Sequence, residues 1–191
     1  MYVYFNRELF GGQLRPVILN FSRAAGALGF FAAGRWGHAR ATTHEISLNP
    51  SHLATRSARS VASTLAHEMV HCWQQEHGKP GKRGYHNKQW AAKMDEIGLV
   101  PSSTGKPDGA RTGFGMSHYV ADSGAFARAF DRMPRSCLLP WSSSDGAPRD
   151  SRAKIKYTCP TCGANAWGKP DLHLVCGDHA ERMTERAEGR R

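Results

Sequence analysis

Long hydrophobic runs, internal repeats and a cysteine-rich framework are all missing from this chain of 191 residues. The longest run of small and apolar residues, 24–34, is too short to cross a bilayer. The first residues do not pair a basic segment with a following apolar one, so we expect no secretory signal and a cytoplasmic protein. These absences argue against a membrane-spanning, secreted or repeat protein.

Cysteines and acidic residues are both scarce. Three of the five cysteines lie close together near the C-terminus, which indicates a metal site in a reducing compartment rather than disulfides. Only 16 aspartates and glutamates face 26 lysines and arginines, so the net charge is +10. This balance predicts a polyanionic partner, most often nucleic acid, although a merely basic globular protein would have the same charge. The length suits one domain with a real core plus a small appendage.

The segment 60–77 carries His67-Glu68-x-x-His71, a pattern typical of metalloproteases when it lies on a helix. Residues four apart share a helical face, so His67 and His71 can hold one Zn²⁺. Glu68 projects about 100° further round and can act as a general base on water at that metal. Apolar residues cover the other half of the helix, which leaves the histidines facing a cleft. The sequence therefore predicts a catalytic zinc site that lacks a third ligand.

Two histidines compete for the third position. His86 opens a second predicted helix, 87–97, whose apolar side packs inward. His77 occupies the third-ligand place of the H-E-x-x-H-x-x-G-x-x-H pattern. That pattern uses glycine to break the helix, whereas Gln74, a helix former, stands at this position. We therefore expect His86 to complete the site, with His77 as the alternative.

Apolar patterning and turn residues predict an α+β core. The predicted elements are, in chain order, helix 3–10, strands 17–21, 28–36 and 42–48, helix 55–76, helix 87–97, strand 116–121 and helix 124–130. In the last of these strands, His118 and Tyr119 can polarise a substrate carbonyl or stabilise an oxyanion, or can be purely structural.

A second metal-binding pattern lies near the C-terminus. Cys159-x-x-Cys162 and Cys176-x-x-His179 form two ligand pairs separated by 13 residues. Three soft thiolates and one imidazole suit a tetrahedral structural Zn²⁺. His173 is the reserve for His179, because its spacing is poorer. We expect a small zinc ribbon that depends on this metal for its fold.

Basic and aromatic side chains surround these ligand pairs. Those expected to contact nucleic acid are Lys154, Lys156, Tyr157, Trp167 and Lys169. Lysines attract phosphates and aromatic rings stack on unpaired bases, as in single-strand binding proteins. Tyr157 and Trp167 can equally form the small core of the ribbon.

Composition also divides the chain into regions. These are a metalloprotease domain at 1–133, a linker rich in serine and proline at 134–153, a zinc ribbon at 154–180 and a tail at 181–191.

Taken together, the motifs resemble the SprT-like family, which includes the Spartan-type DNA–protein crosslink proteases. The resemblance rests on His67-Glu68-x-x-His71, on His86 fifteen residues later followed by Trp90, and on the segment FNRELFGGQL that ends at Leu14. It implies a small zincin-like domain of the α+β class, followed by a zinc ribbon. It also implies a zinc endopeptidase that acts on DNA-associated or DNA-crosslinked proteins.

Two functions from different classes are compatible with these residues. In the first, a peptidase, Glu68 takes a proton from water and passes it to the leaving amine. In the second, the protein is a zinc-containing DNA-binding adaptor that cleaves nothing. The intact Glu68 favours the peptidase, because a structural metal site needs no base beside it.

Overall fold

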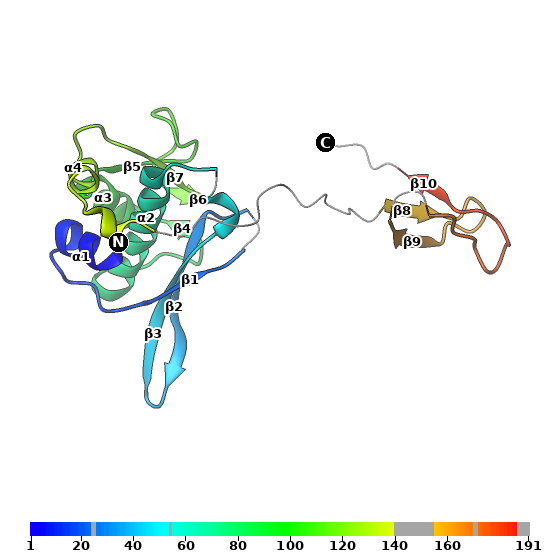
Figure 1. The fold of residues 1–191 in the computed structure, drawn as a ribbon, viewed down its shortest axis with the longest axis horizontal. Helices are drawn as coiled ribbons and strands as arrows, with labels where there is room; N and C mark the ends of the chain where they lie inside the picture. The colour runs from blue at the N-terminus through cyan, green and yellow to red at the C-terminus, as the bar shows by residue number, and fades with distance from the viewer. Residues whose placement is uncertain (24–25, 54, 140–154, 170–171, 187–191) are drawn as a thin grey trace. The chain divides into compact units, whose positions relative to one another are not determined.

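A computed structural model describes five stretches of the chain, 1–23, 26–53, 55–139, 155–169 and 172–186. The chain divides into two units, Met1–Ser144 and Asp145–Arg191 (Figure 1). Most of the predicted linker, from residue 140 to 153, lies outside the described residues. Within the described stretches, no helix combines the length and apolar character that crossing a bilayer requires.

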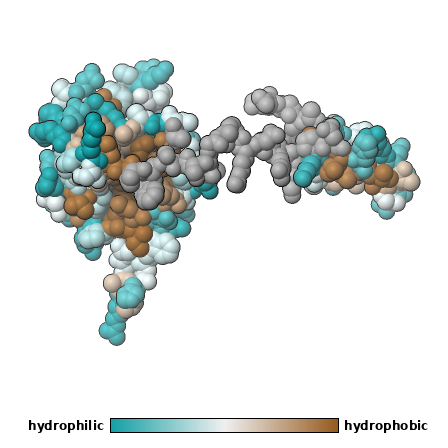
Figure 2. All heavy atoms as spheres, viewed as in Figure 1, coloured by the Kyte–Doolittle hydropathy of each residue, from teal (hydrophilic) through white to brown (hydrophobic). Residues whose placement is uncertain are grey.

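The first unit contains a three-stranded sheet in the order β1-β3-β2 (Figure 1). β1 (Ile18–Phe21) runs parallel to the central strand β3 (Ala41–Leu48), and β2 (Gly29–His38) pairs antiparallel with β3. β2 and β3 form a long hairpin whose turn projects away from the helices (Figure 1). The hairpin tip is mostly hydrophilic, and hydrophobic residues gather nearer the helices (Figure 2). All three predicted strands are confirmed, with ends that differ by one or two residues.

Helix α2 (Ala58–His77) is the centre of this unit, because it contacts β2, β3 and the three other described helices. These helices are α1 (Tyr2–Phe10), α3 (Lys88–Glu96) and α4 (Ala125–Asp131). The core that they enclose is apolar, and its largest fully buried members include Phe5, Ile46, Met69, Trp90 and Phe126. A helix in contact with so many elements has little freedom to move, so its side chains are held in place by packing.

The ends of α2 and α3 follow from side-chain caps. Ser57 Oγ accepts a hydrogen bond from the backbone N–H of Ser60 at 3.2 Å, so α2 begins at Ala58 and not at Thr55 as predicted. Asn87 caps α3 in the same way, accepting from the N–H of Trp90 at 3.0 Å. His86 therefore precedes the helix, and the prediction that it opens α3 is wrong.

Two short antiparallel ladders lie after α2. β4 (Tyr85–His86) pairs with β6 (Gly113–Phe114), and β5 (Leu99–Ser102) pairs with β7 (Ser117–Val120). The strand predicted at 116–121 is confirmed as β7, and the helix predicted at 124–130 as α4. The other three strands were not predicted, because two to four residues carry too little patterning. Single 3₁₀ turns occupy η1 (Pro50–His52) and η2 (Arg135–Cys137).

The second unit is a small antiparallel sheet in the order β10-β8-β9. Its strands are β8 (Ile155–Thr158), β9 (Asn165–Gly168) and β10 (Thr184–Arg186). The ribbon therefore extends past its predicted end at residue 180, because β10 pairs with β8. Each unit combines secondary structure with a core of its own, and the fold as a whole is mixed α/β.

Candidate functional site

The signature histidines lie in the middle of α2, inside the first unit. His67 and Glu68 are 8% and 7% exposed, and His71 is half-buried. Because His67 and His71 are one helical turn apart, their rings leave α2 on the same side, with centroids 5.2 Å apart. The local sequence thus provides two of the ligands that a zinc ion needs.

β4 brings His86 to the same place. The Nε2 atoms of His71 and His86 lie 3.0 Å apart, and the ligand atoms of all three histidines lie within 4.8 Å of one another. Nitrogens bound to one tetrahedral zinc ion are about 3.3 Å apart. The cluster of His67, His71 and His86 therefore fits a zinc ion with one further position open.

The alternative ligand, His77, lies elsewhere. Its Nε2 is 3.2 Å from the carbonyl oxygen of Gln13 and 3.7 Å from a carboxylate oxygen of Glu76. α2 continues without a break through Gln74, so His77 sits about 240° round the helix from His71. The structure brings His86, and not His77, to the two signature histidines.

Hydrogen bonds orient two of the three imidazoles. His86 Nδ1 lies 3.2 Å from the carbonyl oxygen of Gly113, which can only accept. The Nδ1 atom of His86 therefore carries the proton, and its Nε2 offers a lone pair to a metal. His67 Nδ1 lies 3.1 Å from His118 Nδ1, so His67 also has its Nε2 available. Sequence reasoning did not foresee either contact, since a backbone carbonyl and a distant β7 residue give no local signal.

His118 also lines a cleft of about 420 Å³, together with Arg56, Ser60, Ser63 and Tyr119. Burial lowers the pKa of His118 to about 4, and the charge of Arg56 adds to the effect. A neutral His118 can accept the hydrogen bond from His67. The cleft therefore reaches the histidine cluster only through His118, whose ring contacts the candidate ligand His67.

Burial shifts the pKa values of the clustered groups in opposite directions. It lowers the pKa of His67, His71 and His86, to about 3 for His71, so all three are neutral and able to bind a metal. Burial raises the pKa of Glu68 to about 8, and a hydrogen bond from the backbone of Phe31 opposes the rise. Titratable groups shifted this way beside a cleft are typical of a functional site.

Trp90 packs against all three histidines of the cluster. Its ring centroid lies 5.0 Å from that of His67, 5.6 Å from His71 and 4.3 Å from His86. The indole is fully buried, and its Nε1 has no hydrogen-bond partner among the described residues. An unpaired buried N–H costs about 1–3 kcal/mol. Packing against all three histidines is the feature that explains a tryptophan at this position.

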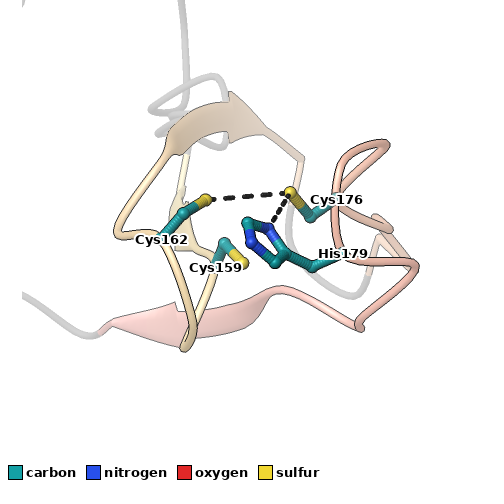
Figure 3. Close-up of side chains that lie close together, drawn as sticks. All are labelled: Cys159, Cys162, Cys176 and His179. Atoms are coloured by element: carbon teal, nitrogen blue, oxygen red, sulfur yellow. Dashed lines mark hydrogen bonds between the residues drawn. The ribbon is translucent and has the colours of Figure 1, made fainter.

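A second ligand cluster lies in the ribbon. The side chains of Cys159, Cys162, Cys176 and His179 turn toward one another, with ligand atoms within 4.8 Å (Figure 3). The sulfurs of Cys162 and Cys176 lie 3.8 Å apart, which matches the edge of a zinc–sulfur tetrahedron, about 3.8 Å. The Cys176 sulfur lies 3.6 Å from His179 Nδ1 (Figure 3). The reserve ligand His173 is exposed and is not part of the cluster.

The residues predicted to contact nucleic acid have different environments. Trp167 is 60% exposed, and Lys169 is also exposed. Lys156 is half-buried opposite Trp167 in the β8–β9 ladder, and Lys154 lies outside the described residues.

Tyr157, by contrast, is 1% exposed, and its hydroxyl donates to the carbonyl of Lys169 at 2.6 Å. Its ring forms the ribbon core and cannot stack on a base. The prediction that Tyr157 contacts nucleic acid is therefore withdrawn.

Comparison with known proteins adds a family assignment. The model of the SprT-like family matches residues 1–108, more than half of the chain. No curated protein and no solved structure matches the sequence. The matched stretch includes α2 with its signature and β4 with His86, whereas His118 and the ribbon lie beyond it. The chain therefore belongs to the SprT-like family.

Proposed function

We propose that this protein is a zinc-dependent endopeptidase that cleaves proteins bound or crosslinked to DNA. The observation that carries the proposal is the convergence of three histidine nitrogens together with the buried Glu68, which follows His67 directly in α2. A purely structural metal site has no need of a buried base. Membership of the SprT-like family suggests a metalloprotease-like function and supports a zincin-like arrangement of α2 and the sheet.

The proposed mechanism assigns a role to each residue of the cluster. His67, His71 and His86 would hold the zinc ion, which would polarise the scissile carbonyl and lower the pKa of water. Glu68 accepts the proton of the attacking water and returns it to the leaving amine. Burial raises the pKa of Glu68 above its ordinary value, which favours return of the proton to the leaving amine, while a nearby zinc ion would favour the carboxylate form that accepts it.

The surrounding residues hold these groups in position. His118 accepts from His67 Nδ1, and the Gly113 carbonyl accepts from His86 Nδ1, so both rings keep the tautomer that binds metal. The cleft beside His118 offers space for a substrate chain.

The ribbon supports the part of the proposal that concerns DNA. Its four ligands suit a structural zinc, which gives two zinc ions per chain. Three thiolates remain free to bind zinc in a reducing compartment such as the cytoplasm. The net charge of +10 and the exposed Trp167 favour a nucleic acid, which would concentrate the peptidase on DNA-bound substrates.

The test is incubation of zinc-loaded protein with a protein crosslinked to DNA, and with the same protein free of DNA. We expect fragments from the crosslinked substrate, faster with DNA present, and none from Glu68→Gln, which keeps every zinc ligand. Equal cleavage by wild type and Glu68→Gln would exclude the mechanism. A non-proteolytic adaptor would instead bind the DNA and leave the substrate intact.

A further inference from the structure

The loop between α2 and α3 is strongly basic. Residues 78–88 contain no acidic residue and four basic ones, Lys79, Lys82, Arg83 and Lys88. All four are exposed, and none forms an ion pair with any other described residue. Three of these charges lie in the loop and the fourth, Lys88, begins α3, so a short stretch of chain carries four uncompensated charges that attract a polyanion.

Two exposed aromatic rings accompany these charges. Tyr85 and Phe114 face each other across the β4–β6 ladder, with centroids 5.1 Å apart and ring planes at 75°. Tyr85 is 40% exposed and Phe114 is 66% exposed. Phe114 does not belong to the core of the first unit, so packing does not account for it. Exposed rings beside lysine and arginine are the combination that binds single-stranded nucleic acid.

Hydrogen bonds hold the loop in shape. Gln89 Oε1 accepts from the backbone N–H of Lys79 at 2.7 Å, and Asn87 Nδ2 donates to the Lys79 carbonyl at 3.0 Å. The N–H of Tyr85 donates to the carbonyl of Lys82 at 2.8 Å. A surface formed in advance loses less conformational entropy when a ligand binds.

We infer that single-stranded nucleic acid binds this surface, which we call the β4–β6 surface and define as Lys79, Lys82, Arg83, Tyr85, Lys88 and Phe114. Phosphates contact the basic side chains, and an unpaired base stacks on Phe114. Bases in a duplex are already stacked, so they do not offer a free face to this ring. The inference rests on the nucleic-acid partner of the proposed function and locates a contact in the first unit.

The β4–β6 surface shares its backbone with the histidine cluster. Tyr85 precedes His86 in β4, and Phe114 follows Gly113, whose carbonyl orients His86. Side chains alternate along a strand, so Tyr85 points outward while His86 points inward. Nucleic acid on the outer side would therefore contact the same two short strands, β4 and β6, that position the third candidate ligand, His86.

The experiment uses the full chain carrying Glu68→Gln, so that binding is measured separately from cleavage. Labelled oligo(dT) and a duplex are titrated by fluorescence anisotropy at several salt concentrations. Phe114→Leu should weaken oligo(dT) binding by about 5- to 150-fold, while Phe114→Tyr retains it. Lys82→Ala/Arg83→Ala should reduce the slope of log K against log salt by about 1.4, since each single-strand phosphate contact contributes about 0.7.

The matched control is Arg40→Ala/Lys106→Ala, which removes one arginine and one lysine, both exposed, from elsewhere in the first unit. If the Phe114→Leu variant and the Lys82→Ala/Arg83→Ala variant both bind oligo(dT) as tightly as this control does, the inference is overturned. If wild type binds no oligo(dT), both the inference and the nucleic-acid part of the proposed function fail. If the protein binds oligo(dT) in a Phe114-dependent way but cleaves no substrate, only the peptidase part of the proposed function fails.

A gain-of-signal variant provides a second, direct measurement. Phe114→Trp should show more tryptophan quenching on addition of oligo(dT) than the protein with Phe114, whose five tryptophans include the exposed Trp167, because a stacked base contacts the new indole. No additional quenching at saturating oligo(dT) would overturn the stacking contact even if the other variants had lost stability.

Discussion

The histidine cluster and the ribbon cluster differ most in what surrounds them. The first lies in a large core, has the buried Glu68 next to one of its histidines and offers three candidate ligands. The second offers four candidate ligands, and among the described residues of the ribbon its buried core consists of Tyr157, Cys159, Cys176 and Met183. Two of these four are themselves candidate ligands. The comparison teaches that a metal bound in the first unit would keep a position open for chemistry, whereas a metal bound in the ribbon would take the place of a large hydrophobic core.

The largest expected effect is loss of the ribbon without its metal. Zinc contributes about 10–16 kcal/mol to the folding of comparable small metal-bound peptides. Cys159→Ser/Cys162→Ser should therefore unfold the second unit while the first unit keeps its own unfolding transition. Amide hydrogen exchange and zinc analysis measure this, with one zinc per chain expected. Persistent protection of β8 and β9 in the variant would contradict the comparison.

The next effect separates the base from the ligands in the first unit. Glu68→Gln should lower the cleavage rate by about 10²- to 10⁴-fold and leave two zinc ions per chain. His86→Ala should instead release the catalytic zinc, because it removes one of three ligands. Elemental analysis with a peptidase assay distinguishes the two variants. His77→Ala is the control, and loss of zinc there but not in His86→Ala would show that the ligand assignment is wrong.

A smaller effect is expected at His118, which positions His67. His118→Phe keeps a ring but removes the acceptor, so zinc affinity should fall by about 10- to 100-fold. Chelator competition measures the affinity, and the absorption spectrum of the cobalt-substituted protein reports ligand geometry. His118→Gln supplies a new acceptor oxygen and should restore part of the affinity. Equal affinities in wild type and His118→Phe would assign His118 to packing alone.

The smallest effect concerns the buried hydrogen bonds of Glu45, which we expect to stabilise the first unit without any metal. Glu45 is 1% exposed and accepts from Ser47 Oγ and Trp36 Nε1, both at 2.6 Å, with Arg35 Nε at 2.9 Å. Burial alone would raise the pKa of Glu45, but these hydrogen bonds and the Arg35 charge lower it overall. A carboxyl with a lowered folded pKa stabilises the protein above its unfolded pKa, and loses this effect as pH falls through the folded pKa.

Glu45→Gln should therefore reduce the free energy of unfolding by about 1.5 kcal/mol at neutral pH, and by less in acid. Urea unfolding in the presence of chelator measures this without any contribution from metal. Asp131→Asn, in an exposed pair with Arg59, is the control and should change little. A difference between Glu45→Gln and wild type that does not shrink in acid would contradict this assignment.

Sequence patterning predicted the larger elements of the fold well. α2 has a long apolar face, and the strands of the main sheet combine apolar residues with flanking turn residues, so local patterns located them. β4, β6 and β10 are two or three residues long, and their pairing depends on distant partners. The start of α2 was predicted too early, because the Ser57 cap was not recognised as its boundary.

The sequence by itself determined the parts of both sites that depend on local spacing. His67 and His71 share a face because they are one helical turn apart, and each ribbon ligand pair is formed within one turn of chain. Sequence reasoning also preferred His86 over His77, and the tertiary structure brings His86 to the pair across 15 residues. Only the tertiary structure decided that Gly113 and His118 orient the cluster, across 27 and 51 residues. It also decided that Tyr157 is core and that Tyr85 and Phe114 form an exposed pair. These outcomes depend on which strands pair and which surfaces pack together, and those contacts have no signature in the spacing of neighbouring residues.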